Sequence, residues 1–274
     1  MTILSIFLLG LFATIGYIIL STFRKNTQPL FSTALFRDSN FVFASIMIAM
    51  MGLGLFGTII IQTLMLQNLL DYPAHLAGLT VAPRGLASMF TMIFVGKIAH
   101  RIEAKPLIFA GLLFNVVGTY LCTHFSLDIS PVEIIVPNLI QGVGLGLVFA
   151  PLSTLALSTL PLSLRSEGAG LFSLTRTFGL SIGTSIAITI LTRNTQTAWN
   201  QIRGAINPFN IELYTYLNKL NLNPTEPLST VIISQEVYKQ ASMIAVLDVF
   251  IVITYSFAAI IPLALLLKSR QETA

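Results

Sequence analysis

Hydrophobic residues in this chain form long, nearly uninterrupted stretches. Seven of them are long enough, at about 1.5 Å of rise per residue, for an α-helix to cross the hydrocarbon core of a bilayer. They run from Ile3 to Phe23, Phe41 to Leu66, Leu76 to Gly96, Pro106 to Thr123, Ile134 to Leu157, Gly168 to Thr192 and Ala241 to Leu267. None of them alternates like a barrel strand, and an open strand in lipid would leave backbone groups unpaired. The pattern therefore predicts an all-α, polytopic membrane protein with seven transmembrane helices.

The composition agrees with a chain whose solvent is a bilayer. Hydrophobic residues make up 54% of the 274 residues and charged residues only 9%, which leaves too little polar surface to solvate a globule of this size. The net charge of +4 is strung between the apolar stretches rather than gathered on one face, which argues against a nucleic-acid partner. Cys122 is the only cysteine, so an intrachain disulfide and a thiolate metal cluster are excluded. We expect membrane lipid around the chain and neither a metal nor a cofactor.

Lysine and arginine concentrate on alternate connections between the apolar stretches, and this bias predicts the orientation. One set of connections carries nine of the fifteen cations: Arg24, Lys25, Arg37, Lys97, Arg101, Lys105, Arg165, Lys268 and Arg270. The opposite set carries Arg193, Arg203, Lys219 and Lys239, all in the long connection 193–240, where the rule weakens. We expect an external N-terminus, a cytoplasmic C-terminus and an external loop at 193–240. This loop is expected to lie on the membrane surface, with docking of a partner as the alternative.

Charged residues inside the stretches mark candidate functional positions, because each costs about 2.5 to 3.5 kcal/mol on insertion scales. Arg176 follows the start of its stretch by eight residues, roughly 12 Å at helical rise. We favour a side chain that faces a cavity, on a substrate path or at a gate. Arg84 lies at similar depth from the outer side, where a cavity role and snorkelling to the interface both remain open. Asp248 enters from the same side and could pair with Arg84 or act as a protonatable carboxylate.

Uncharged polar residues and glycines inside the stretches are weaker candidates. Gln62 is a possible substrate-path residue, although a helix–helix hydrogen bond is the interpretation that we favour. Four glycines have the small-xxx-small spacing that lets helices approach closely, and we expect helix packing from them rather than ligand contact. These are Gly142, Gly146, Gly179 and Gly183.

The short cytoplasmic connection from Gly96 to Lys105 interleaves basic and acidic residues after a glycine at a predicted helix end. Such a loop can latch neighbouring helix ends together, with Gly96, His100, Arg101 and Lys105 as its candidate residues. A plain positive connection is the alternative. The sequence contains no Gly-rich phosphate loop, catalytic triad, paired carboxylates or metal-spaced ligands, so an enzyme is not expected.

Several segments resemble the major facilitator superfamily, in particular its fourteen-span drug:proton antiporters of the EmrB/QacA type. The most specific is LFSLTRTFGLSIGTSIA from Leu171 to Ala187, supported by APLSTLALSTLP from Ala150 to Pro161 and NPFN from Asn207 to Asn210. The loop GKIAHRIEAK resembles the superfamily's loop motif in a degenerate form. His100 stands at the position where the motif usually has an acidic residue. The likeness extends from about Phe36 to Leu267.

The resemblance implies one linker helix at 1–23, a cytoplasmic connector at 24–40 and a C-terminal six-helix transporter domain at 41–270 with its periplasmic loop at 193–240. Such a half offers one wall of a transport path, so the N-terminal half is an expected partner. The implied function is proton-coupled efflux of amphipathic drugs across the bacterial inner membrane, with the proton as coupling ion. The alternative is a non-transporting membrane subunit that binds a permease or a periplasmic adaptor protein.

Overall fold

The computed structural model describes residues 32–98, 102–205 and 227–267, and this part of the chain contains helices and loops without any strand. Its long helices are α2 (Ser39–Asn68), α3 (Ala74–Ile98), α4 (Ala104–Cys122), α5 (Pro131–Ser158), α6 (Arg165–Ala205) and α8 (Pro227–Leu266). All six are long and apolar enough to cross a membrane. The all-α polytopic class is thus confirmed. The predicted span from Ile3 to Phe23 lies outside the described residues.

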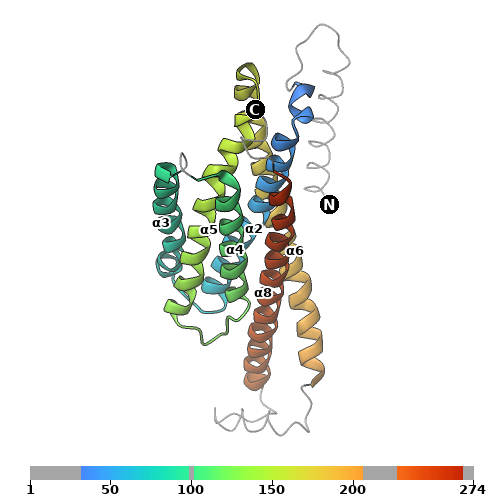
Figure 1. Cartoon of the computed structure of the whole chain (residues 1–274). Helices are drawn as coiled ribbons and strands as arrows, with labels where there is room; N and C mark the ends of the chain where they lie inside the picture. Colours follow the sequence, from blue (N-terminus) through green and yellow to red (C-terminus); the bar gives the residue numbers. More distant parts are fainter. Residues whose placement is uncertain (1–31, 99–101, 206–226, 268–274) are drawn as a thin grey trace.

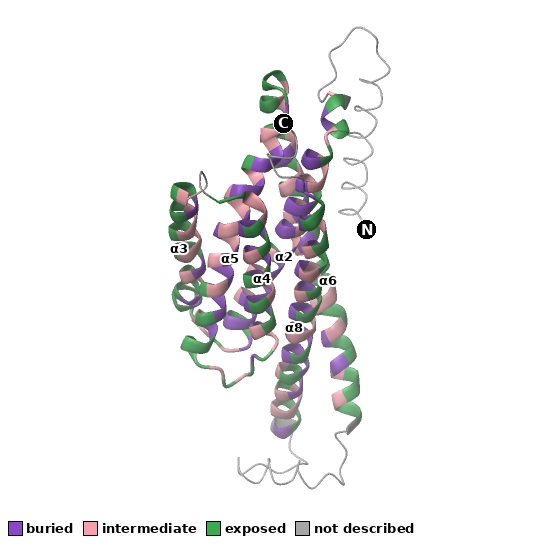
Figure 2. Cartoon of the chain, viewed as in Figure 1, coloured by how far each residue is buried: buried purple, intermediate pink, exposed green. Residues whose placement is uncertain are grey.

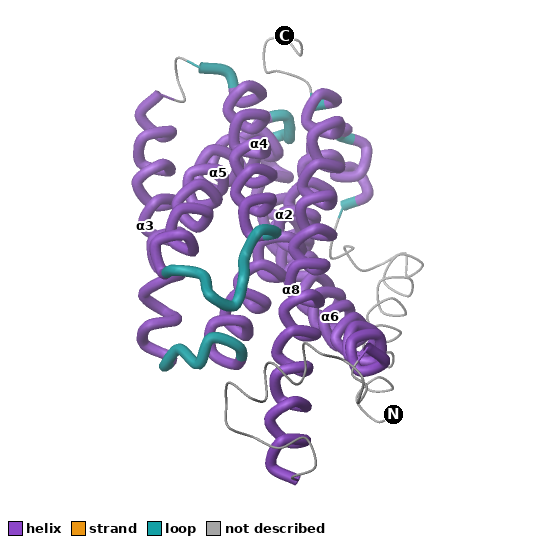
Figure 3. The backbone as a smooth tube through the Cα atoms, turned by 90° about the horizontal axis from the view of Figure 1, so that it is seen from below, coloured by secondary structure: helices purple, strands orange, loops and turns teal. Residues whose placement is uncertain are grey.

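The six helices form two groups of three that pack together. Helix α5 packs against both α3 and α4, while α2 packs against α6 and α6 against α8. Helix α8 also contacts α2 within its group and joins the groups through contacts with α4, and α2 also contacts α5 (Figure 1). Short loops connect most of the helices (Figure 3). Helix α2 therefore contacts members of both groups.

The core lies where these helices meet. Phe41, Met47 and Ile61 of α2 and Phe250 and Phe257 of α8 are fully buried. Bulky side chains from helices far apart in sequence therefore fill the interior.

Local polar contacts set several helix starts. The Asp38 carboxylate accepts a hydrogen bond from the Phe41 backbone N–H at 2.9 Å, so α2 begins at Ser39, inside the connector predicted at 24–40. The Ser130 backbone N–H donates to Glu133 at 3.0 Å in the first turn of α5. The Ser32 backbone N–H donates to the carboxylate of Glu167 at the start of α6. This last contact ties the first described residues to α6.

Glycines produce the closest helix contacts. A Cβ at Gly142 would collide with the Arg84 carbonyl, and one at Gly146 would lie 2.6 Å from the Thr91 Cβ, so α5 approaches α3 through both positions. On α6, a Cβ at Gly179 would collide with the backbone of Ala49 and one at Gly183 with that of Leu53. Backbones can approach to this extent only where side chains are missing.

Helices α6 and α8 are longer than the apolar stretches that predict them. The external loop expected at 193–240 is helical at both ends, because α6 continues to Ala205 and α8 already begins at Pro227. The extensions pack on one another: the rings of Trp199 and Tyr238 meet edge-on at 6.4 Å. Figure 1 shows both extensions projecting beyond the other helices. Hydropathy reports the membrane-spanning part of a helix, whereas mutual packing stabilises the polar turns beyond it.

Helices α3 and α6 expose most of their apolar surface. Only 17% of the most apolar window of each is buried, against 50% for α2. Leu79 and Phe90 of α3 are each 64% exposed, and Figure 2 shows exposed positions along this helix. Apolar surface of this extent requires lipid or further helices around it.

Candidate functional site

A groove follows one face of α2. It consists of two cavities of about 300 and 450 Å³ that adjoin, since Leu55 and Leu145 line both. We call it the α2 groove. Its floor comes from α2 residues at helical spacing, and α3, α5 and α6 supply its sides. The α2 residues include Ile48, Met51, Leu55, Ile59, Thr63 and Gln67.

Arg176 lines the smaller cavity of the groove. Its guanidinium carbon lies 5.3 Å from the ring centroid of Phe149 on α5, within cation–π range. Its Nε is buried without a hydrogen-bond partner among the described residues. A Cβ at Gly52 would be 3.0 Å from the Arg176 carbonyl, so this glycine lets α6 approach α2 at the same level. The arginine is therefore half-buried in an apolar cavity, as expected of a cavity-facing residue.

Arg84 lines the larger cavity, but its guanidinium is inside the helix bundle. The residue is 3% exposed, and all three side-chain nitrogens are buried without a partner among the described residues. A snorkelling side chain would place these nitrogens at the membrane surface, which is not the observed arrangement. Arg84 and Arg176 thus lie beside the two parts of one groove, with the Arg84 nitrogens enclosed in the bundle, a relationship that sequence alone does not contain.

Asp248 and Gln62 do not line the groove. The Asp248 carboxylate accepts a hydrogen bond from the Asn194 side chain of α6 at 2.9 Å, so the possible ion pair with Arg84 is not formed. Between the described residues, the one ion pair joins Lys239 and Asp71. Both polar atoms of the Gln62 side chain are buried without a hydrogen-bond partner among the described residues. The prediction of a helix–helix hydrogen bond from Gln62 is therefore wrong for this part of the chain.

The predicted latch loop is described only at its ends. Helix α3 continues through Gly96 to Ile98, so this glycine does not end the helix as expected. Gly96 is exposed, and a Cβ there would meet no atom within 4 Å. Lys105 lies in the first turn of α4. His100 and Arg101 lie outside the described residues. The latch remains a prediction.

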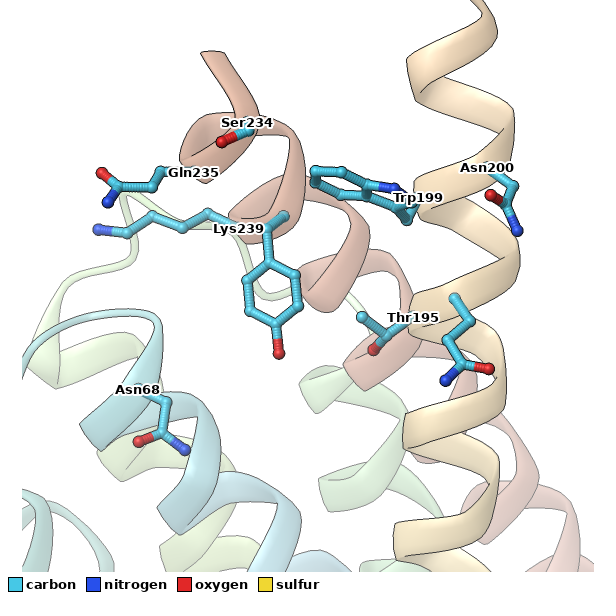
Figure 4. Close-up of a pocket in the computed structure, with 9 residues that line it drawn as sticks. Asn68, Thr195, Trp199, Asn200, Ser234, Gln235 and Lys239 are labelled. Carbon is cyan, nitrogen blue, oxygen red and sulfur yellow. The ribbon is translucent and has the colours of Figure 1, made fainter. Parts of the chain in front are cut away.

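A second pocket, which sequence reasoning missed, lies between the extensions of α6 and α8 and the end of α2. Its volume is about 820 Å³, and its lining combines an aromatic pair with amides and one lysine (Figure 4). Its residues are Asn68, Thr195, Gln196, Trp199, Asn200, Ser234, Gln235, Tyr238 and Lys239. The available signal was the single tryptophan, Trp199, beyond the end of an apolar stretch, where aromatic residues mark membrane interfaces.

The chemistry of the α2 groove suits reversible binding. Its polar groups are few and its walls are mainly aliphatic and aromatic, as in sites for amphipathic small molecules. Within the described residues, no group of three or more His, Cys, Asp or Glu side chains could hold a metal ion.

The helices and the groove define a multi-pass helical membrane protein. The chain belongs to the major facilitator superfamily, whose family model matches residues 1–184. Members of this superfamily are carriers rather than enzymes. Within this superfamily, the relatives to which this chain is similar are consistent with the EmrB/QacA type.

The multidrug export protein EmrB of Escherichia coli strain K12 is 28% identical over 225 residues, which cover 81% of this chain and 44% of EmrB. The fatty acid resistance protein FarB of Neisseria gonorrhoeae is 26% identical over 88% of this chain and 48% of its own length. The multidrug transporter protein MdtP of Bacillus subtilis is 31% identical over 69% of this chain and 34% of its own length. The chain thus spans about half of the length of EmrB and FarB and about a third of the length of MdtP.

Proposed function

We propose that this chain is the C-terminal half of a proton-coupled multidrug efflux permease, and that the α2 groove forms its part of the substrate path. The observation that carries the proposal is the placement of Arg176 in an apolar groove along α2, a helix that contacts both helix groups. Apolar walls with few polar groups bind amphipathic molecules without demanding one shape. The names of the relatives, which include multidrug export and multidrug transporter proteins, support the same class.

Transport requires a second wall, which we assign to an N-terminal half. Alternating access is a movement of two halves against one another around a shared site. The described lining of the α2 groove includes Arg84 and Arg176 but neither Asp nor Glu. We therefore assign the acid that carries the coupling proton mainly to the other half.

An efflux assay tests this proposal. Inverted vesicles that contain this chain with an N-terminal half should accumulate amphipathic drugs when a proton gradient is imposed, and vesicles with this chain alone should not. Normal membrane insertion without any drug accumulation by the joined halves would contradict the function. Arg176→Ala and Arg176→Lys should each reduce efflux at normal expression, whereas Arg193→Ala, an exposed arginine on the same helix, should not. Full efflux by both Arg176 variants would refute its role.

We further propose that the protein resides in the bacterial inner membrane with a periplasmic N-terminus and a cytoplasmic C-terminus. The distribution of lysine and arginine supports this orientation. Because Cys122 is the only cysteine, Cys122→Ser gives a cysteine-free background. In that background an impermeant maleimide added to intact spheroplasts should label Ser126→Cys, in the loop before α5, and not Ser163→Cys, in the loop after it. Labelling of Ser163→Cys and not of Ser126→Cys would show that the orientation is the opposite one.

A second candidate is a non-transporting subunit that binds a permease or a periplasmic adaptor. The observation in its favour is the open pocket beside Trp199 and Tyr238 on the helix extensions. Trp199→Ala should then abolish pull-down of a co-expressed adaptor or permease while membrane insertion stays normal. Unchanged pull-down by this variant would count against docking at this pocket.

A further inference from the structure

We propose that the α2 groove selects amphipathic anions, with the guanidinium of Arg176 binding the anionic head group. This inference rests on the proposed function, because it takes the groove as the substrate path. It narrows the amphipathic drugs of that proposal to molecules of one sign of charge.

The first support is the chemistry around Arg176. The other side chains of its cavity are apolar, among them Ile48, Met51 and Leu180. The Arg176 side chain forms no ion pair with a described residue, and the Phe149 ring is its one favourable electrostatic partner there. A cation in apolar surroundings is stabilised most by a charge-assisted hydrogen bond, and a guanidinium binds carboxylate or sulfate oxygens through two parallel bonds.

The second support is the sign of the charge along the groove. The Arg84 guanidinium, enclosed in the helix bundle behind the larger cavity, adds positive charge close to the groove without facing it. No described Asp or Glu lines the groove, and three of these carboxylates have partners elsewhere: Asp248 binds Asn194, Asp71 binds Lys239, and Glu167 binds the Ser32 backbone. The described wall therefore attracts anions and repels cations, and low-polarity surroundings strengthen both effects.

The third support is the shape of the site. The cavity beside Arg176 has a volume of about 300 Å³ and adjoins the larger, mainly apolar cavity at Leu55 and Leu145. A ligand with its head group at Arg176 can lay an apolar tail along α2. Burial of that tail supplies affinity in proportion to its area, and the arginine supplies orientation.

Photolabelling of the purified full chain in phosphatidylcholine nanodiscs tests the proposal. The probes are a diazirine-bearing fatty acid and a diazirine-bearing alkyltrimethylammonium of equal chain length, and the labelled peptides are mapped by mass spectrometry. We expect the anion to label α2 groove peptides about tenfold more than the cation, the factor that one charge-assisted contact supplies. Arg176→Gln should lower anion labelling to the level of the cation. Arg176→Lys should retain part of it, and Arg193→Gln, an exposed control on α6, should not change it.

Three results would overturn the proposal. One is equal or stronger labelling by the cation, and another is unchanged anion labelling in an Arg176→Gln protein with the wild-type elution profile. The third is complete displacement of the fatty acid by phosphatidylglycerol in the nanodisc, which would identify a membrane lipid as the occupant. The binding assay is independent of transport. Export of cations by the joined halves would overturn the anion preference alone, whereas anion binding without any export would overturn the proposed function alone.

Discussion

The side-chain amide of Asn194 on α6 donates a hydrogen bond to the carboxylate of Asp248 on α8 at 2.9 Å. The two residues are 54 positions apart in the chain, and both side chains are partly buried. This bond joins α6 to α8 close to the polar extensions of both helices. It gives the intramembrane acid of α8 a partner other than either arginine of the groove.

Removal of the Asn194 amide should destabilise the contact between these helices. We expect Asn194→Ala to lower the free energy of unfolding by roughly 1 to 3 kcal/mol, because a partly buried carboxylate loses a charge-assisted hydrogen bond. Thermal unfolding in detergent measures the change. Thr197→Ala, an exposed position on the same helix, is the control and should have little effect. An Asn194→Ala protein as stable as the control would show that the bond contributes nothing.

The glycine contact between α6 and α2 predicts a sharp difference between two alanine substitutions. Gly183→Ala should cost roughly 1 to 3 kcal/mol, because its Cβ would collide with the backbone of Leu53, which cannot rotate away. Gly170→Ala on the same helix should be neutral or stabilising, since a Cβ there would meet no atom within 4 Å. Thermal unfolding of both variants measures the difference. Equal melting temperatures would contradict the close approach of α6 to α2.

Substitutions of Asp71 should change the stability of the protein through the backbone conformation rather than through the ion pair. It has a φ of 54° in the turn between α2 and α3, a region that Asn tolerates and β-branched residues avoid. Asp71→Val should destabilise the protein by roughly 1 to 2 kcal/mol. Asp71→Asn should change stability by less than about 1 kcal/mol, because its ion pair with Lys239 is solvent-exposed. A larger loss for the asparagine variant would assign the main role to the ion pair.

Fluorescence gives direct access to the pocket between the helix extensions, because Trp199 is the single tryptophan of the chain. Tyr238→Leu removes the ring that meets Trp199 edge-on at 6.4 Å and opens the indole to water. We expect its emission maximum to shift to longer wavelength. Tyr255→Leu, far along α8 and highly exposed, should leave the spectrum unchanged. An unshifted Tyr238→Leu spectrum would contradict the packing of the two extensions.

Arg84 is predicted to reduce the stability of this chain. Its three buried side-chain nitrogens have no partner among the described residues, and burial of unpaired charge is unfavourable. Arg84→Met keeps much of the side-chain volume and should stabilise the chain by about 1 kcal/mol or more. Arg193→Met, an exposed substitution of the same type, should have almost no effect. A lower melting temperature for Arg84→Met would reveal a stabilising partner for the guanidinium.

Much of the architecture could be predicted from the sequence, because membrane insertion depends on local composition. Long apolar stretches identify each of the six described spans, and glycines at small-xxx-small spacing occur at the observed close approaches. The charged positions inside the membrane, Arg84, Arg176 and Asp248, are also evident from the apolar residues around them. These properties depend on neighbours within a few helical turns.

Only the tertiary structure decided what those positions contact. It placed Arg176 over Phe149 and paired Asp248 with Asn194. It also extended α6 and α8 beyond their apolar stretches and joined two cavities into one groove along α2. Each outcome depends on the rotation and approach of helices that are distant in sequence. Hydropathy and charge determine that a helix crosses the membrane, whereas packing between helices determines which face of it meets which neighbour.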